Sequence, residues 1–161
     1  MKIQIPEYIQ VLIDLLNQNH YNAYVVGGAI RNALLGLPIH DYDLTTDATP
    51  DEMLQVFSSY RLFKTGIQHG TITVLSNGQP VEITTFRSEN TYEDHRHPST
   101  VSFSSNIEED CKRRDFTINA LCYNKSEGLI DFFGGIEDLQ HKIIRCIGNP
   151  HERIDEDALR I

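Results

Sequence analysis

The sequence has no apolar run near the roughly 18 residues that a membrane-spanning helix requires, so no membrane partner is expected. Its start, Met1–Pro6, lacks the apolar stretch and small-residue cleavage site of a signal peptide. Only three cysteines occur, Cys111, Cys122 and Cys146, and their spacing matches no zinc motif. We therefore expect reduced thiols and a cytoplasmic location.

Positive charge is scarce as well. The 14 lysines and arginines stand against 23 acidic residues, which gives a net charge of −9. Nucleic-acid binding normally needs clustered basic residues that neutralise phosphates, so bulk charge argues against it, and we expect no DNA partner. Two interpretations stay open: an RNA-binding surface lies elsewhere in a longer protein, or the acidic residues bind metal ions.

The residues that are present suit a globular domain. The 161 residues fit one domain, or one domain and the start of another, and 40% of them are hydrophobic. Asn77-Gly78 between two alternating segments predicts a hairpin turn. Apolar spacing predicts helices at 7–19, 29–35, 50–57, 115–122, 136–141 and from 150 onward, and strands at 22–26, 39–45, 60–64, 71–75, 81–86 and 129–131.

The final helix begins near Pro150 and meets no capping residue before Ile161. We therefore expect the chain to be a piece of a longer protein. Residues 88–100 are polar and aperiodic, and they predict a long loop of the kind that often has a function.

Three carboxylates are candidate metal ligands. Asp41 and Asp43 lie two apart on the strand predicted at 39–45, so both are expected to project from one face. Carboxylates this close repel each other unless a cation lies between them, and hard oxygen ligands favour Mg²⁺. Taken alone, the pair is more typical of a solvated strand end than of a metal site. Glu82 is a candidate third carboxylate, or else an exposed or paired strand residue.

A phosphate-binding turn precedes the carboxylates. Gly27-Gly28 joins a predicted strand to a predicted helix, and Arg31 lies one turn into that helix. Glycine lets a phosphate approach the backbone, the helix N-terminus offers free N–H groups, and an arginine adds a charge-assisted fork. Alone, Gly-Gly is equally a tight turn. Followed by Asp41 and Asp43, it predicts a site for a triphosphate with Mg²⁺.

Three ordered motifs carry a resemblance to a known family. Residues 26–36, Val-Gly-Gly-Ala-Ile-Arg-Asn-Ala-Leu-Leu-Gly, with Asp41-Tyr42-Asp43, resemble the first motif of class II tRNA nucleotidyltransferases and bacterial poly(A) polymerases. Residues 113–120, Arg-Arg-Asp-Phe-Thr-Ile-Asn-Ala, resemble the second motif, and residues 156–160, Glu-Asp-Ala-Leu-Arg, the start of the nucleotide-selecting motif. One departure is Asn32, where the family usually carries Asp; this change puts a contact that orients Arg31 in question.

The resemblance implies an α/β (α+β) fold, a polymerase-β-like nucleotidyltransferase head with a mixed sheet of about five strands and flanking helices. It implies that the head covers residues 1–140 and that 141–161 begin the nucleotide-selecting neck. By the family pattern, two Mg²⁺ ions bind Asp41 and Asp43. Gly28 and Arg31 would contact the triphosphate, while Arg114, Asp157 and Arg160 would hold the incoming nucleotide.

The implied reaction is template-independent addition of C and A to the 3′ end of tRNA, from CTP and ATP, with release of pyrophosphate. Asp157 and Arg160 lie three apart on the predicted helix and share a face. The Asp157 acceptor and the Arg160 donors match the amino donor and ring-nitrogen acceptor of cytosine and adenine. With uracil or guanine, acceptor would face acceptor and donor would face donor. The tRNA would be held mainly by further domains, and residues 88–100 resemble the loop used in switching from C to A.

Other functions remain open. A poly(A) polymerase, or an enzyme adding only CC or only A, would use the same head. A nucleotidyltransferase acting on a small molecule would share Gly-Gly and Asp-x-Asp but would not need Arg114, Asp157 and Arg160. A Rossmann-like nucleotide-binding module fits poorly, because Gly27-Gly28 is not Gly-x-Gly-x-x-Gly. Lys112 and Arg113 are equally compatible with surface charges.

Overall fold

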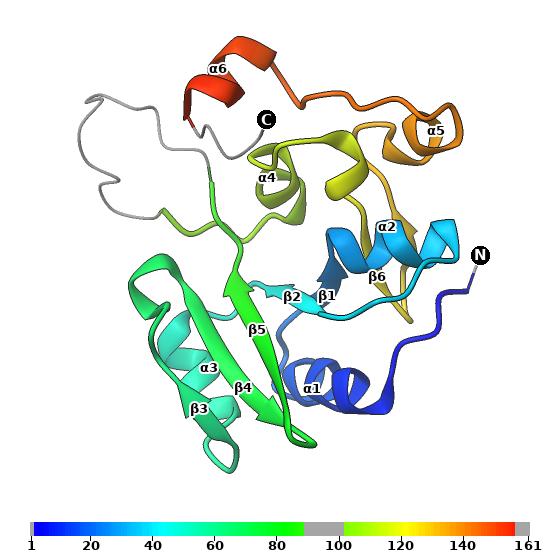
Figure 1. Ribbon diagram of the computed structural model, residues 1–161. Coiled ribbons are helices and arrows are strands. Elements are labelled where there is room, and N and C mark those ends of the chain that lie inside the picture. Colours follow the sequence, from blue (N-terminus) through cyan, green and yellow to red (C-terminus); the bar gives the residue numbers. More distant parts are fainter. Residues whose placement is uncertain (1, 89–101, 157–161) are drawn as a thin grey trace.

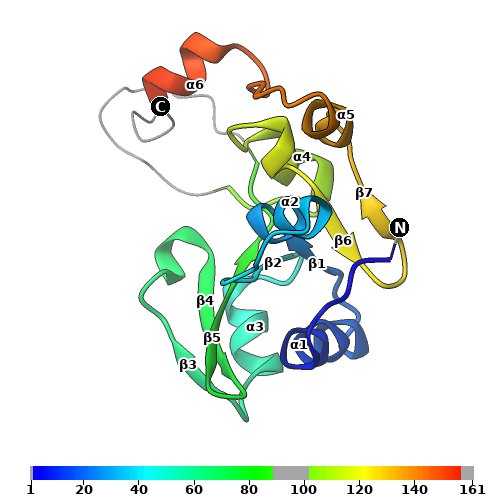
Figure 2. The same cartoon turned by 45° about the vertical axis from the view of Figure 1, so that its right-hand side comes forward.

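The structure is a computed structural model that describes residues 2–88 and 102–156. Its described part contains a single mixed sheet with helices beside it, as Figures 1 and 2 show. The helices are α1 (Glu7–Gln18), α2 (Gly28–Leu35), α3 (Pro50–Val56), α4 (Ile107–Lys112), α5 (Gly135–Gln140) and α6 (Pro150–Glu156). The strands are β1 (Ala23–Val26), β2 (Asp43–Thr46), β3 (Arg61–Phe63), β4 (Thr71–Ser76), β5 (Gln79–Thr85), β6 (Cys122–Asn124) and β7 (Gly128–Ile130).

The strands lie in the order β3-β4-β5-β2-β1-β6-β7. Only the β2–β5 pair is parallel among the described strands; the other neighbours are antiparallel. The expected α/β fold with flanking helices is confirmed, with seven strands in place of about five. No helix in the described ranges is long and apolar enough to cross a membrane.

Alternating residues of the central strands divide the core into two clusters. On one face, Val25 and Leu44 join a large cluster that includes the buried side of α1. On the other face, Tyr24 and Val26 pack with Phe86, Cys111, Cys122 and neighbouring residues. Alternate residues of each strand therefore belong to different faces of the sheet. Asp43 and Glu82 lie on the second face, because Asp43 pairs with Val26 and lies beside Glu82.

Local sequence signals explain most elements. Thr49 and Glu52 form the reciprocal capping box that starts α3. Asn77 and Gly78 have φ of 49° and 74°, which makes the tight β4–β5 turn predicted from the sequence.

One predicted helix, at 115–122, is wrong. Asp115 accepts hydrogen bonds from the Phe116 backbone and the Asn119 side chain, and these local bonds favour a turn over a helix. The segment instead forms a 3-10 turn at Thr117–Asn119 and then strand β6. Phe116 also forms a β-bridge with Cys146, which holds the segment in extended form at that point.

Candidate active site

The metal-ligand candidates lie at the start of β2. Asp43 is the first residue of β2 and lies beside Glu82 in the parallel β2–β5 register. Asp41 precedes the strand, so the prediction that both aspartates lie on one strand at 39–45 is wrong for Asp41. The reason is that β1 ends at Val26, the partner of Asp43, and the chain then turns into α2, leaving β1 no residue to pair with Asp41. All three carboxylates are exposed.

Negative charge accumulates around Asp43. Although its side chain reaches solvent, the sheet removes part of the hydration of the carboxylate, and this desolvation raises the pKa of Asp43. The nearby charge of Glu82 raises that pKa further, and Asp41 adds to the effect, while Arg114 lowers it. Asp43 therefore loses its proton less readily than an ordinary aspartate, and a nearby cation would favour the ionised form.

The donor set suits a hard divalent cation. No group of three or more His, Cys, Asp or Glu side chains within residues 2–88 and 102–156 is placed to hold a metal ion by itself. Mg²⁺ is commonly bound through one or two carboxylates, with phosphates and water supplying the other ligands. Asp43 with Asp41 or Glu82 fits that requirement when a nucleotide is present.

The glycine turn leads directly from β1 into α2. Gly27 has φ of 72°, a conformation that favours glycine, and its N–H donates to the carbonyl of Leu121. A Cβ on Gly28 would lie 3.3 Å from Nη2 of Arg31, so a side chain there would crowd the guanidinium. The turn thus places the N-terminus of α2 beside Arg31, and the role of this turn as a phosphate site stays a prediction.

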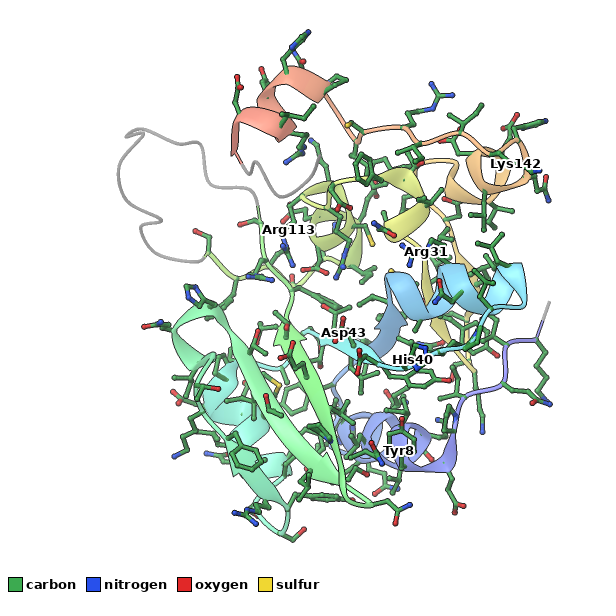
Figure 3. All side chains as sticks on the ribbon, in the orientation of Figure 1. Tyr8, Arg31, His40, Asp43, Arg113 and Lys142 are labelled. Atoms are coloured by element: carbon green, nitrogen blue, oxygen red, sulfur yellow. The ribbon has the colours of Figure 1, made fainter. Side chains whose placement is uncertain are left out.

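Arg31 is held from two sides. Its Nη1 donates to Oδ1 of Asn119 at 2.6 Å. Its Nε and Nη2 donate to Oδ1 of Asn32 at 3.2 and 3.1 Å. The contact that the Asn32 departure put in question is therefore present, with an amide oxygen as the acceptor. Figure 3 shows Arg31 at α2 and Arg113 beside α4, above Asp43.

Arg114 borders the same turn. Its Nη1 lies 3.7 Å from the position that a Cβ on Gly27 would take, and its charge acts on Asp43. Its Nη2 donates to Asp110 at 3.2 Å. The structure thus brings together Gly28, Arg31, Arg114 and the carboxylates.

The sequence reasoning missed Asp110. This side chain has no exposed surface and pairs with both Arg113 and Arg114. Spacings of three and four residues from an acid to two arginines favour pairs on a helix and were the available signal. Arg113 is accordingly part of a buried ion-pair cluster, and only about a fifth of its side chain is exposed, at 22%.

Two groups of predicted residues lie outside the described ranges. Asp157 and Arg160 follow the described part of α6, and residues 89–100 of the predicted 88–100 loop belong to the gap. Their expected roles remain predictions.

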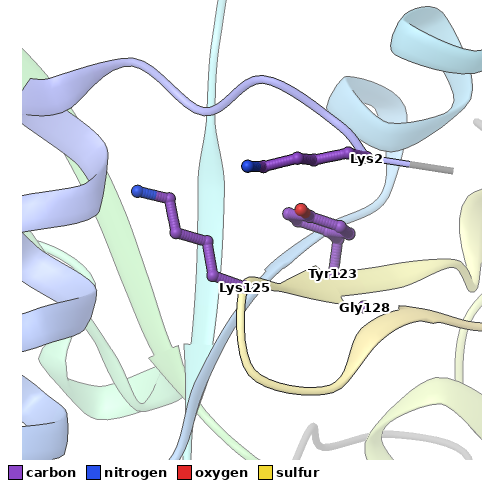
Figure 4. A pocket seen from close by; sticks show the side chains of 4 residues that line it. All are labelled: Lys2, Tyr123, Lys125 and Gly128. Carbon is purple, nitrogen blue, oxygen red and sulfur yellow. The ribbon is translucent and has the colours of Figure 1, made fainter.

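A separate pocket lies at the β6–β7 hairpin (Figure 4), with a volume of about 410 Å³. It is lined by Lys2, Tyr123, Lys125 and Gly128. Tyr123 belongs to the cluster on the α1 face, so this pocket opens on the opposite side of the sheet from Asp43.

Comparisons with known proteins show the family of this chain. Residues 23–145 match the family described as poly A polymerase head domain. The CCA-adding enzyme of Enterococcus faecalis is 52% identical over 150 residues, covering 93% of this chain and 36% of the relative. That of Staphylococcus saprophyticus is 47% identical over 155 residues, covering 96% of this chain and 38% of the relative.

Solved structures of CCA-adding enzymes are similar to this chain in fold. The Bacillus stearothermophilus CCA-adding enzyme in complex with CTP has a TM-score of 0.84 and 39% identity, covering 97% of this chain and 38% of that one. The Thermotoga maritima CCA-adding enzyme complexed with tRNA has a TM-score of 0.74 and 27% identity, covering 99% and 37%. The chain spans little more than a third of the length of these relatives. It belongs to the poly A polymerase head domain family.

Proposed function

We propose that this chain is the catalytic head of a cytoplasmic tRNA nucleotidyltransferase that adds C and A to the 3′ end of tRNA, using CTP and ATP. One observation supports the proposal most directly: Gly28 and Arg31 follow Val26, and Val26 pairs with Asp43. The turn that would bind phosphate is therefore next to the carboxylates in the sheet. Similarity to CCA-adding enzymes, one of them solved with CTP, supports the same substrates.

Each site residue has its own role in one nucleotidyl transfer, a substitution at the α-phosphorus. Gly28 and the first N–H groups of α2 receive the triphosphate, and Arg31 binds its oxygens. The 3′ oxygen of the primer attacks the α-phosphorus, a new O–P bond forms, and the bond to the β-phosphate oxygen breaks as pyrophosphate leaves. Two Mg²⁺ ions held by Asp41 and Asp43 would lower the pKa of the primer hydroxyl and offset charge on the phosphates.

Nucleotide choice rests on residues outside the described ranges. Asp157 and Arg160 present an acceptor and donors to the pairing edge of the base, which favours cytosine and adenine. Arg114, which borders the glycine turn, also binds the nucleotide. The tRNA itself would be held mainly by further domains of the whole protein.

The test uses the chain with a tRNA that ends before CCA, at high primer concentration, with Mg²⁺ and each labelled NTP offered separately and then in pairs. Incorporation of C followed by A supports the proposal, and D43N should abolish it. A long A tail on any RNA would instead identify a poly(A) polymerase, and CC alone or A alone a partial enzyme. No Mg²⁺-dependent incorporation of any nucleotide would contradict a catalytic role.

A further inference from the structure

Asp110 is a buried carboxylate with four hydrogen-bond donors. Its Oδ1 accepts from the Arg87 backbone N–H at 3.0 Å and from Nε of Arg113 at 3.3 Å. Its Oδ2 accepts from the Thr45 hydroxyl at 3.1 Å and from Nη2 of Arg114 at 3.2 Å. Each oxygen therefore has two partners, and none of its surface is exposed to solvent.

These donors come from separate parts of the fold. Thr45 lies two residues after Asp43 on β2 and, by the strand period, on the same face of the sheet. Arg87 follows the end of β5, and Arg113 and Arg114 follow α4. One carboxylate thus connects the strand that begins with Asp43 to the arginine beside the glycine turn.

Arg114 depends on Asp110. The bond from Nη2 to Asp110 is the single side-chain hydrogen bond that Arg114 makes with residues 2–88 and 102–156, and its Nε is buried without a partner. A long guanidinium side chain with one hydrogen-bond acceptor has few constraints on its position. Without the carboxylate, no described side chain would accept a hydrogen bond from the Arg114 guanidinium.

The electrostatics keep Asp110 ionised. Burial by itself would raise the pKa of Asp110, but Arg113, Arg114 and the Arg87 N–H more than compensate and lower it. Burial, together with the neighbouring charges of Arg87 and Arg114, lowers the pKa of Arg113 to about 10, with Asp110 opposing the change. The guanidinium groups of Arg87, Arg113 and Arg114 repel one another. The negative charge of Asp110 offsets this repulsion for Arg113 and Arg114, which both pair with it.

We propose that Asp110 is a positioning residue for nucleotidyl transfer, one that fixes the Arg114 guanidinium relative to Asp43 and the glycine turn. Asp110 has no exposed surface with which to contact nucleotide or metal, and it acts through Arg114. The inference rests on the proposed function, since Arg114 is a nucleotide ligand only if the chain binds NTPs. It would make α4 part of the nucleotide site rather than only part of the core.

The experiment compares D110N with D47N by titration of CTP in the presence of Mg²⁺. Asp47 is a matched control, because it accepts two hydrogen bonds from Asn22, at 2.8 and 2.9 Å, and touches none of the site residues. We expect D110N to bind CTP about tenfold more weakly and D47N to change affinity less than about twofold, since bonds to charged groups dominate. Thermal unfolding of both variants measures how much folding stability each substitution costs, separately from its effect on CTP affinity.

A double-mutant cycle separates positioning from general stability. In an R114Q background, D110N should weaken CTP binding no further, because its effect passes through Arg114. The ¹⁵N signal of Arg114 Nε should also shift in D110N without ligand. If D110N fails to fold, T45V removes a donor to the same oxygen, and a loss of about threefold in CTP affinity is expected.

Three outcomes would overturn the inference. These are CTP binding by D110N as tight as by D47N, fully additive effects of D110N and R114Q, or T45V binding CTP like the wild type when D110N does not fold. A wild-type chain that binds no CTP would instead contradict the proposed function, so the two failures are distinguishable.

Discussion

The side-chain oxygen of Asn32 accepts hydrogen bonds from both Nε and Nη2 of Arg31, at 3.2 and 3.1 Å. The same amide donates from Nδ2 to the carbonyl of Pro38 at 3.0 Å. An aspartate could accept from Arg31 with a full charge, but it has no N–H for Pro38 at neutral pH. The Asn32 side chain therefore both accepts hydrogen bonds from Arg31 and donates one to Pro38, in the segment that follows α2.

This relationship predicts different results for two substitutions at position 32. N32A removes both contacts and should weaken CTP binding by about threefold to tenfold, the effect of roughly 1 kcal/mol. N32D keeps the Arg31 contact and should retain CTP affinity while losing thermal stability. N19A is the matched control, because the Asn19 side chain bonds only to the backbone of α1. Equal CTP affinity in N32A and N19A would contradict this role.

Asp43 should be essential for catalysis yet costly for the metal-free fold. D43N should lower nucleotide incorporation by more than about a hundredfold, because a metal ligand is lost. Its stability without Mg²⁺ should rise at pH 7. Burial and Glu82 raise the pKa of Asp43, so the ionised carboxylate destabilises the folded state, and the amide removes that cost.

Thermal unfolding with and without Mg²⁺ measures this effect. The wild type should gain stability when Mg²⁺ and CTP are added, and D43N should gain little. As the pH falls through the raised pKa of Asp43, the difference between the metal-free proteins should shrink. A D43N protein that is less stable than the wild type at pH 7 without metal would show that the Asp43 carboxylate stabilises the metal-free fold, against the expected repulsion.

Asp110 should give the opposite dependence on pH. Its pKa is lowered by Arg113 and Arg114 against the effect of burial, so its stabilising contribution is complete above the ordinary value of 3.8. That contribution is lost as the pH falls below this value, through the lowered pKa. D110N should be less stable than the wild type at pH 7 by about 3 kcal/mol, the usual cost of breaking a buried ion pair. Urea unfolding from pH 7 to pH 3 should show the gap closing only at the acid end.

Gly135 should tolerate no side chain. A Cβ there would lie 2.3 Å from the backbone oxygen of Thr117, which cannot rotate away. G135A should cost about 2–3 kcal/mol in urea unfolding and weaken CTP binding, because the same turn carries Asn119. At Gly36 a Cβ meets nothing within 4 Å but φ is 67°, so G36A should cost only about 1 kcal/mol through backbone strain. Equal losses in the two variants would contradict the steric explanation.

The parts of the fold that could be predicted from the sequence depend on local signals. The apolar spacing of α1, the Thr49–Glu52 capping box and the Asn77-Gly78 turn each act within a few residues, and each is confirmed. Strand β6 could not be predicted in the same way. It has only three residues, all of them buried, and it pairs both with its neighbour β7 and with β1, which lies far away in the sequence.

The same distinction explains the site. Gly28, Arg31 and Asp43 belong to neighbouring elements, so motif spacing was enough to place them together. Asp110 is different, because its spacing to Arg113 and Arg114 indicated local ion pairs, whereas its bond to Thr45 joins residues 65 positions apart. Long-range partners decide the role of such a residue, and no local pattern contains them.

The pairing of β6 with β1 also fixes the order of events during synthesis. Gly27 donates its N–H to Leu121, and Val26 pairs with Cys122, so the glycine turn is braced by residues made almost a hundred positions later. Closing such a loop costs chain entropy before any contact repays it. A nascent chain that has made only Asp41 and Asp43 therefore holds its carboxylates without a finished phosphate cradle. Under the proposed function, the chain can bind nucleotide only after the segment that carries Arg114 and Leu121 has left the ribosome.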